Sequence, residues 1–294
     1  AGVFSGTLDG LGNSIGNLSI SNTGPNVGRF ARSSGTLSNL KLNNLRVSDN
    51  TYGSGPSSLG ALVGINSGRI ANVSASGVSV VGSRLRSNAL GGLVGRNING
   101  QITNASVSGG VTAYAASTAV GGLVGENFTT AWGPEAVIEN AHSNVHVAAQ
   151  STERNSLGGV GGLVGLSSGG EIFRSQASGS VYSKGGLATG GLIGKAEGNG
   201  MLGNLKASGS VMDQGGADLG GLVGNNSQGA IETAEATGKV SGGSNSRVGG
   251  LIGHNLGGSV AHAISRGDVS GGFNSLVGGL VGHNGGELFN GDGG

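Results

Sequence analysis

Histidines and carboxylates are the side chains in this chain that could bind a metal or transfer protons, because it contains no cysteine. His254 and His283 follow two copies of the same short motif, but the other copies carry unrelated residues there, so we predict a variable position that points outward. His142 and His146 have no third ligand at a suitable spacing, and a zinc site needs three or four. We therefore predict no metal site and no cofactor.

The carboxylates form no catalytic constellation either. The 15 acidic residues are scattered along the chain, so the carboxylate pair that glycoside hydrolysis requires cannot be identified. The sequence contains neither His-Glu-x-x-His nor a glycine loop followed by Lys and Ser or Thr. We predict that the chain is not an enzyme.

One stretch has a composition suited to ligand binding. The single tryptophan, Trp132, lies near Glu126, Glu135 and Glu139 in the sequence. An indole ring offers a flat apolar face for a sugar, and carboxylates accept hydrogen bonds from sugar hydroxyls. These four residues form our candidate binding site. The alternative is a neutral loop whose tryptophan covers the flank of the fold.

The charge and hydropathy of the chain limit its partners. It has 16 basic and 15 acidic residues, a formal net charge of +1 and no basic run, which argues against nucleic acid. No apolar run approaches the about 20 residues of a membrane-spanning helix.

A repeat must position these residues. Gly-Gly-Leu-Val-Gly, or a variant with one change, occurs at residues 60–64, 91–95, 121–125, 161–165, 190–194, 220–224, 249–253 and 278–282. A period near 30 residues is typical of stacked repeats. The interval that begins at residue 121 is longer, at 40 residues, and insertions of this kind form loops on one face.

Each copy predicts three short strands: the Gly-rich stretch, a segment of the form Ile-x-Asn-Ala, and a segment such as Ala-Ser-Gly-Ser-Val. Apolar residues alternate with small polar ones, and no segment is long enough for a helix. The pattern predicts an all-β solenoid of about nine to ten coils with about 30 residues each. We predict one domain over residues 1–294, with degenerate coils at 1–58, regular repeats at 59–294 and an enlarged coil at 121–160.

Asparagine recurs at two positions of the repeat. The first column is Asn66, Asn97, Asn127, Asn226, Asn255 and Asn284, with interruptions at Ser167 and Ala196. The second is Asn17, Asn39, Asn72, Asn104, Asn140, Asn204 and Asn290. Stacked amides hydrogen-bond between coils, and Asn tolerates left-handed backbone conformations. We predict structural ladders; the alternative is a surface that binds glycans or ice.

The leucine of each Gly-rich stretch forms a further column: Leu62, Leu93, Leu123, Leu163, Leu192, Leu222, Leu251 and Leu280. Because apolar residues occupy both faces of this predicted strand, only one face can line the coil interior. We expect another part of the coil to cover the leucines. The alternative is an exposed apolar stripe that packs against another molecule.

The last copy ends in the middle of its second segment, near Leu288 and Phe289, and leaves an open strand edge. Phe4 and Leu8, in the opening segment, could complete that coil in another copy. We expect either that the chain continues or that copies stack head to tail.

With its repeats aligned, the sequence resembles the GLUG-motif repeats of bacterial surface and secreted proteins. Residues 4–20 resemble the segment that begins such arrays. The resemblance implies an extracellular location and roles in adhesins, filamentous exoproteins and non-catalytic parts of immunoglobulin A peptidases, and it carries over no catalytic residue.

We therefore expect a non-catalytic rod, structural or adhesive, that is secreted or on the bacterial cell surface and forms filaments or contributes to biofilm. The expected partners are other copies, surface glycans, and host or neighbouring-cell proteins. The alternative is a carbohydrate-binding module of a larger secreted adhesin or enzyme that uses the coil around Trp132. A polysaccharide-degrading enzyme would need acidic and basic side chains clustered on adjacent coils.

Overall fold

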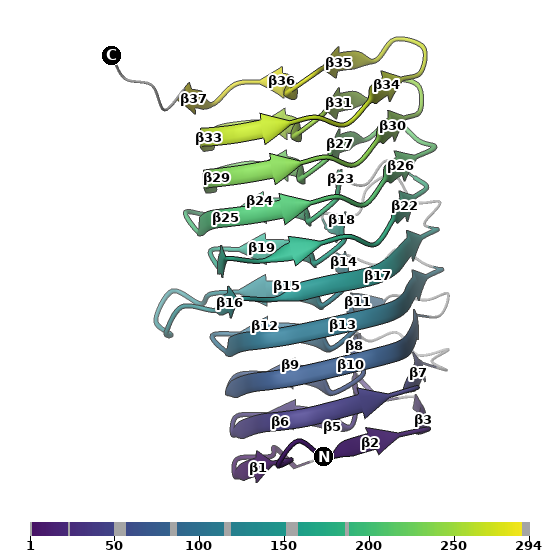
Figure 1. Cartoon of the computed structure of the whole chain (residues 1–294), viewed down its shortest axis with the longest axis vertical. Helices are drawn as coiled ribbons and strands as arrows, with labels where there is room; N and C mark the ends of the chain where they lie inside the picture. The colour runs from purple at the N-terminus through teal and green to yellow at the C-terminus, as the bar shows by residue number, and fades with distance from the viewer. Residues whose placement is uncertain are drawn as a thin grey trace.

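The chain folds into an all-β solenoid whose coils stack along one axis (Figure 1). The computed structural model describes residues 2–22, 24–49, 57–82, 87–114, 119–150, 158–185 and 188–289. Strands of successive coils pair in parallel and in register, one repeat apart. The prediction of an all-β solenoid is confirmed.

Two inner ladders carry one strand from each coil. The leading ladder consists of β4 (Asn26–Val27), β8 (Ser57–Gly60), β11 (Ser87–Gly91), β14 (Ala119–Gly121), β18 (Gly159–Gly161), β23 (Ala188–Gly190), β27 (Asp218–Gly220), β31 (Arg247–Gly249) and β35 (Leu276–Gly278). The trailing ladder consists of β5 (Phe30–Ser33), β9 (Val63–Asn66), β12 (Val94–Ile98), β15 (Val124–Phe128), β19 (Val164–Ser168), β24 (Ile193–Glu197), β28 (Val223–Asn226), β32 (Ile252–Asn255) and β36 (Val281–Asn284).

Each inner ladder has nine strands, counted over the described residues. Because one full turn separates each strand from the next, the solenoid has about eight full turns of about 30 residues. This number is slightly lower than the nine to ten coils that the sequence predicts, because the first and last coils are partial.

The outer sheet wraps around the ladders. Its first half consists of β1 (Thr7–Asp9), β2 (Ser14–Gly16), β3 (Ser19–Asn22), β6 (Thr36–Asn43), β7 (Arg46–Asp49), β10 (Arg69–Gly82), β13 (Gln101–Ala113), β16 (Val137–Glu139) and β17 (His142–Ala149). Its second half consists of β20 (Glu171–Phe173), β21 (Gln176–Ala177), β22 (Val181–Ser183), β25 (Met201–Ala207), β26 (Val211–Asp213), β29 (Ala230–Ala236), β30 (Val240–Gly242), β33 (Ser259–Ser265), β34 (Val269–Gly271) and β37 (Glu287–Phe289). The second and third predicted segments join into one strand in β10 and β13 and separate in later coils.

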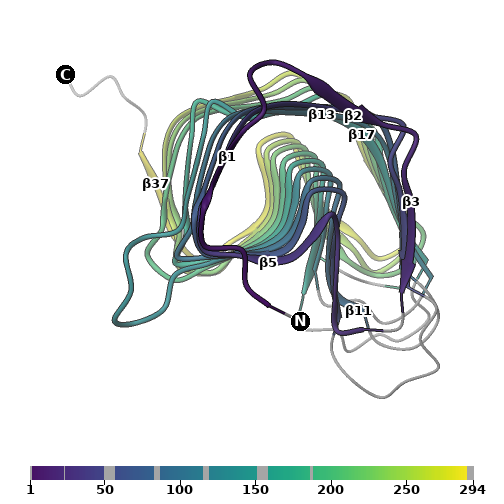
Figure 2. The same cartoon turned by 90° about the horizontal axis from the view of Figure 1, so that it is seen from below.

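Each coil follows the same path, which Figure 2 shows along the solenoid axis. The leading strand runs inward, the chain bends, and the trailing strand runs back out before the outer sheet curves around both. The bends of successive coils therefore lie inside the outline of the outer sheet (Figure 2).

The Gly-rich stretch forms this bend, so the prediction that it is a single strand is wrong. In one coil Gly91 ends β11 and Val94 begins β12, with Gly92 and Leu93 between them. A Cβ atom on Gly92 would overlap the carbonyl oxygen of Gly122 in the next coil. Glycine is needed here because the backbones of neighbouring bends touch.

The leucine at the bend is buried in every coil from Leu62 to Leu251, where each is 0% exposed, and Leu280 is partly buried. The bend also contacts the inner face of the outer sheet: a Cβ on Gly92 would lie 3.1 Å from a methyl group of Val107. The expectation that another part of the coil covers the leucines is confirmed, and the alternative of an exposed stripe is wrong. Both faces of the stretch are apolar because it lies inside the coil.

Candidate functional site

The loop around Trp132 extends from the side of the solenoid. It occupies residues 129–136, between β15 and β16, and is the teal excursion at the lower left of Figure 2. The Trp132 side chain is 99% exposed. An indole ring in this position leaves both of its faces free for a ligand.

Hydrogen bonds to the preceding coil hold the loop in shape. The Asn99 side chain donates to Thr130 Oγ1 (2.7 Å) and accepts from the Thr130 N–H (2.8 Å). The Ala136 N–H donates to Thr129 Oγ1 (2.9 Å), which closes the base of the loop. Gly133 lies against the Asn99 amide, where a Cβ atom would collide. The loop therefore presents Trp132 from an ordered base.

The three predicted carboxylates interact with partners on neighbouring coils. Glu126 pairs with Arg96 at 2.6 Å, with only 16% of its side chain exposed, and Glu139 pairs with Arg174. Glu135 faces Glu171, whose pKa is raised by partial burial and then by the charge and hydrogen bond of Glu135. The structure records no contact that joins any of the three to Trp132, among the residues that it describes.

Sequence analysis did not identify Glu171, which comes next to Glu135 only through the stacking of two coils. Residues 151–157 of the predicted enlarged coil lie outside the described residues.

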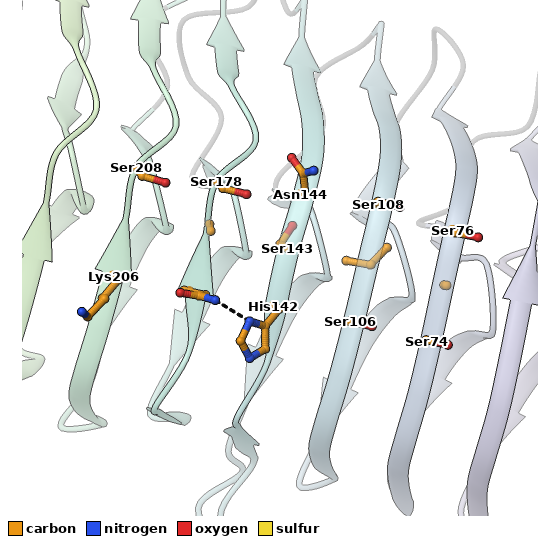
Figure 3. Close-up of a pocket in the computed structure, with 14 residues that line it drawn as sticks. Ser74, Ser76, Ser106, Ser108, His142, Ser143, Asn144, Ser178, Lys206 and Ser208 are labelled. Carbon is orange, nitrogen blue, oxygen red and sulfur yellow. Dashed lines mark hydrogen bonds between the residues drawn. The ribbon is translucent and has the colours of Figure 1, made fainter. Parts of the chain in front are cut away.

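A second candidate surface lies on the outer sheet, on the side away from the inner ladders (Figure 3). It is a shallow groove of about 420 Å³ that crosses five coils. Two columns of polar side chains line it: Ser74, Ser106, His142, Gln176 and Lys206 in the first, and Ser76, Ser108, Asn144, Ser178 and Ser208 in the second. His142 and Gln176, on adjacent coils, are hydrogen-bonded to each other at 2.5 Å.

The groove continues toward the N-terminus. A neighbouring cavity of about 350 Å³ shares Ser74 and Ser106 with it and adds the side chains of Asn39, Lys41, Asn72 and Asn104. Together the two cavities form one polar groove, which we call the serine groove, from Lys41 to Lys206. Sequence analysis did not identify it, although the pattern Ser-x-Ser at residues 74–76 and 106–108 was a visible signal.

The first asparagine column is buried beside the trailing ladder, except at Asn284 on the last coil, which is exposed. The Asn97 Nδ2 atom donates to Asn127 Oδ1 (2.9 Å), and Asn66 donates to Asn97 (2.8 Å). After the gap at Ser167 and Ala196, Asn226 donates to Asn255 (3.1 Å) and Asn255 donates to Asn284 (2.8 Å). Each side chain also bonds to the backbone of the following turn, as Asn97 does to the Gly100 carbonyl (2.8 Å).

The second column lies on the outer sheet. Asn140 donates to Asn104 (2.6 Å), Asn104 to Asn72 (3.0 Å) and Asn72 to Asn39 (3.1 Å). Asn204 continues the column at a φ of 54°. Every member of it from Asn39 to His262 has a positive φ, including Arg174 and Thr233.

Two predicted members of the second column need separate comment. The strand register pairs Gly16 with Asn43, so Asn17 belongs beside Asn44, to which it is hydrogen-bonded (3.3 Å). The assignment of Asn17 to the Asn39 column is therefore wrong, because residues 10–16 of the first coil do not keep the spacing of later coils. Asn290 lies outside the described residues.

A polar cluster lies between the inner ladders near the C-terminal end. Asp218 accepts hydrogen bonds from Asn225 (2.7 Å) and Arg247 (2.5 Å), and its carboxylate is 3.4 Å from His254 Nδ1. His254 packs edge-on against His283, with ring centroids 4.8 Å apart. Burial lowers the pKa of His254, as do Arg247 and His283, while Asp218 opposes the shift.

Within the described ranges, no group of three His, Asp or Glu side chains is arranged to hold a metal ion. The prediction that this repeat position points outward is wrong for His254, which is only 5% exposed because it packs beside Asp218 and His283.

The residues predicted for self-association lie on the first and last coils. Phe4 packs against Phe30, with ring centroids 5.0 Å apart, and Leu8 is partly buried against the core. Leu288 and Phe289 on β37 are 46% and 53% exposed.

The fold and its repeats define a parallel β-solenoid, and comparison with known proteins identifies the repeat. The GLUG motif matches residues 87–112 and 244–270, which include the bend and the adjoining strands of two coils. The chain therefore carries GLUG motifs in two of its coils, and its solenoid fold is consistent with a GLUG-repeat protein. In the part of the chain that the structure describes, no helix is long and apolar enough to cross a membrane.

The chain is also similar to two named proteins. It is 42% identical to halomucin of Haloquadratum walsbyi over 104 residues, which are 34% of this chain and 1% of halomucin. A Bacteroides ovatus crystal structure, provisionally named an immunoglobulin A1 protease, aligns with a TM-score of 0.53 at 21% identity. That alignment covers 82% of this chain and 69% of the other, and at this identity it shows a shared fold alone.

Proposed function

We propose that the chain is part of a non-catalytic extracellular rod with a structural or adhesive role. The observation that carries the proposal is the contrast between the interior and the surface. The bend leucines repeat through successive coils without change, whereas the outward column that contains Ser74 changes residue type from coil to coil. A scaffold of constant coils with variable outward side chains suits a spacer that makes contacts along its length.

The similarity to halomucin and the GLUG repeats support an extracellular setting. Because the matched segment is 1% of halomucin, the role of the whole protein is part of the proposal. The halomucin match is to an archaeal protein, so the GLUG repeat does not by itself favour a bacterial source.

The adhesive role can be tested with beads coated with the purified chain. We expect the beads to adhere to cells or to one another more than beads coated with a chain unfolded by heat. The same preparation should release no reducing sugar and no peptide from polysaccharide and protein substrates. Equal adhesion by both kinds of bead, or hydrolysis at an enzymatic rate, would contradict the proposal.

A second candidate is carbohydrate binding through Trp132, favoured by its full exposure on an ordered loop. Trp132→Ala should weaken binding on a glycan array, because a stacked aromatic face contributes about 1 kcal/mol. The matched control is Phe273→Ala, which removes another aromatic side chain, 85% exposed, far along the chain. Absence of glycan binding by the unaltered chain would reject this candidate.

We also propose that copies associate end to end, supported by the apolar side chains exposed on the last described coil. Leu288, Phe289, Leu276 and Val277 are each about half exposed there. Deletion of residues 1–23 should abolish fibres in negative-stain images while the circular dichroism of β-structure remains. Fibres that persist after the deletion would rule this arrangement out.

A further inference from the structure

The serine groove is a surface that neither the GLUG repeat nor the Trp132 loop accounts for. Its lining combines hydroxyl, amide, imidazole and ammonium groups and contains no carboxylate over either of its two cavities. Lys41 lies at one end, Lys206 at the other and His142 between them. Just beyond the groove, Glu235 on the next coil pairs with Lys206 at 3.4 Å, an exposed pair that a ligand carboxylate would have to replace. A ligand that matches this lining carries hydroxyl groups and negative charge.

The length of the groove points to a chain-like ligand. The strand register links Lys41 to Ser74, then to Ser106, His142, Gln176 and Lys206, one coil at each step. At about 4.8 Å between neighbouring strands, the two lysines are separated by roughly 24 Å. A small anion cannot reach both, whereas an extended polymer that lies along the solenoid axis can.

The groove also has unused hydrogen-bonding capacity. The hydroxyls of Ser74, Ser106, Ser108 and Ser178 have no recorded protein partner among the described residues, whereas Ser76 donates to Asn43 (2.9 Å). The amides of Asn72 and Asn104 each use one N–H for a bond to the preceding coil and keep a second donor. These groups repeat once per coil, as the hydroxyls of a polysaccharide repeat once per sugar.

Other polymers fit less well. A peptide cannot add to the sheet here, because the strands under the groove are paired on both sides by neighbouring coils. A nucleic-acid strand needs a denser row of basic residues and aromatic stacking platforms, and the lining has two lysines and no Phe, Tyr or Trp.

We propose that the serine groove binds an acidic polysaccharide strand lengthwise along the solenoid axis. The lysines at the two ends bind its carboxylates, and the serine, asparagine and glutamine side chains between them bind its hydroxyls. This site is separate from the Trp132 loop, so each can be removed without the other.

The test is affinity electrophoresis in gels that contain polygalacturonate, a neutral β-1,4-glucan, or no polymer. The polygalacturonate gel should retard the chain, and retardation should weaken with added salt because two ion pairs contribute. Lys41→Gln with Lys206→Gln should weaken binding about fivefold. The charge-matched control is Lys184→Gln with Lys239→Gln, outside the groove, and it should bind as the unaltered chain does.

A second set of variants tests the groove by filling it with a large side chain. Ser106→Tyr places a ring in its centre, on a sheet face where tyrosine is well tolerated, and should reduce binding by more than about tenfold. Ser270→Tyr adds the same ring on β34, outside the groove, and should leave binding intact, as should Trp132→Ala.

Any of the following outcomes would overturn the proposal. The polygalacturonate gel does not retard the chain, or the neutral glucan retards it equally. Oligodeoxythymidine at equal charge concentration displaces the polygalacturonate, or Ser106→Tyr leaves binding unchanged. Loss of binding in Trp132→Ala alone would instead support the Trp132 site and reject the groove.

Discussion

The two asparagine columns occupy different environments although both repeat once per coil. Asn97 is buried and has an ordinary backbone conformation, and its side chain bonds in three directions. Asn104 is exposed on the outer sheet and has a φ of 52°. The comparison indicates that asparagine is kept inside for its buried hydrogen bonds and outside for its backbone conformation.

The largest effect is expected at the bend, where the inner region has least space. In Gly122→Ala the new Cβ would overlap the Gly162 carbonyl and the Ser143 hydroxyl, so adjacent coils must separate. We expect a loss of more than about 4 kcal/mol in the free energy of unfolding, measured with urea. Gly279→Ala, at the same position of the last coil, meets no atom within 4 Å and should change stability by less than about 0.5 kcal/mol. Equal losses of stability in Gly122→Ala and Gly279→Ala would show that close backbone contact is not what requires glycine at the bend.

The buried column comes next. Asn97→Ala removes the partner of Asn66, Asn127 and Gly100 in a site without access to water. We expect a loss of about 3 kcal/mol, because buried polar groups lose their bonds on both sides. Asn97→Gly should lose at least as much, since the backbone there needs no special freedom. A loss below about 1 kcal/mol in urea titration would show that the ladder contributes little.

The exposed column should respond to backbone conformation instead. Asn104→Ala should lower the free energy of unfolding by about 1 kcal/mol. A residue that has a Cβ atom but no side chain able to hydrogen-bond locally is disfavoured at positive φ. Asn104→Gly should be nearly neutral, which is the opposite ranking from position 97. Thr233 has a φ of 58° in the same column and is β-branched, so Thr233→Asn should gain about 1 kcal/mol. Thermal denaturation of the three variants checks the ranking, and an Asn104→Gly as unstable as Asn104→Ala would contradict it.

The smallest effect concerns pH at the polar cluster. Because the pKa of His254 is lowered in the folded chain, the unfolded chain takes up this proton first as pH falls below about 6.5. Stability should therefore fall from pH 6.5 downward and level off below the folded pKa. His254→Gln should reduce this slope, whereas His262→Gln, at an exposed site, should preserve it. An unchanged slope in His254→Gln would show that other groups cause the pH dependence.

The repeat period and strand content of the fold could be predicted from the sequence. The spacing of the Gly-rich stretches predicts the stacking, because in-register coils place equivalent residues one strand apart. The position of that stretch could not be predicted, since alternation alone does not reveal that Gly92 and Leu93 form a bend inside the coil. Apolar residues on both faces of the stretch were the available sign.

The candidate sites were less predictable. Trp132 stood out by its residue type, but its neighbours Glu126 and Glu139 pair with arginines of other coils. The serine groove depends on which residues of five coils share one face, and that requires the register. Its small side chains resemble ordinary surface residues until the coils are stacked.

The central claim is that neighbouring coils stabilise one another through the inner bends, so these should open only with the whole structure. Native-state hydrogen exchange measures this directly at the amides of Leu93, Leu123 and Leu222, each bonded to the next bend carbonyl at 2.9–3.0 Å. The account predicts that the three amides exchange with the same free energy as global unfolding. Exchange of any of them within seconds, or as fast as the exposed amides of the Trp132 loop, would contradict it.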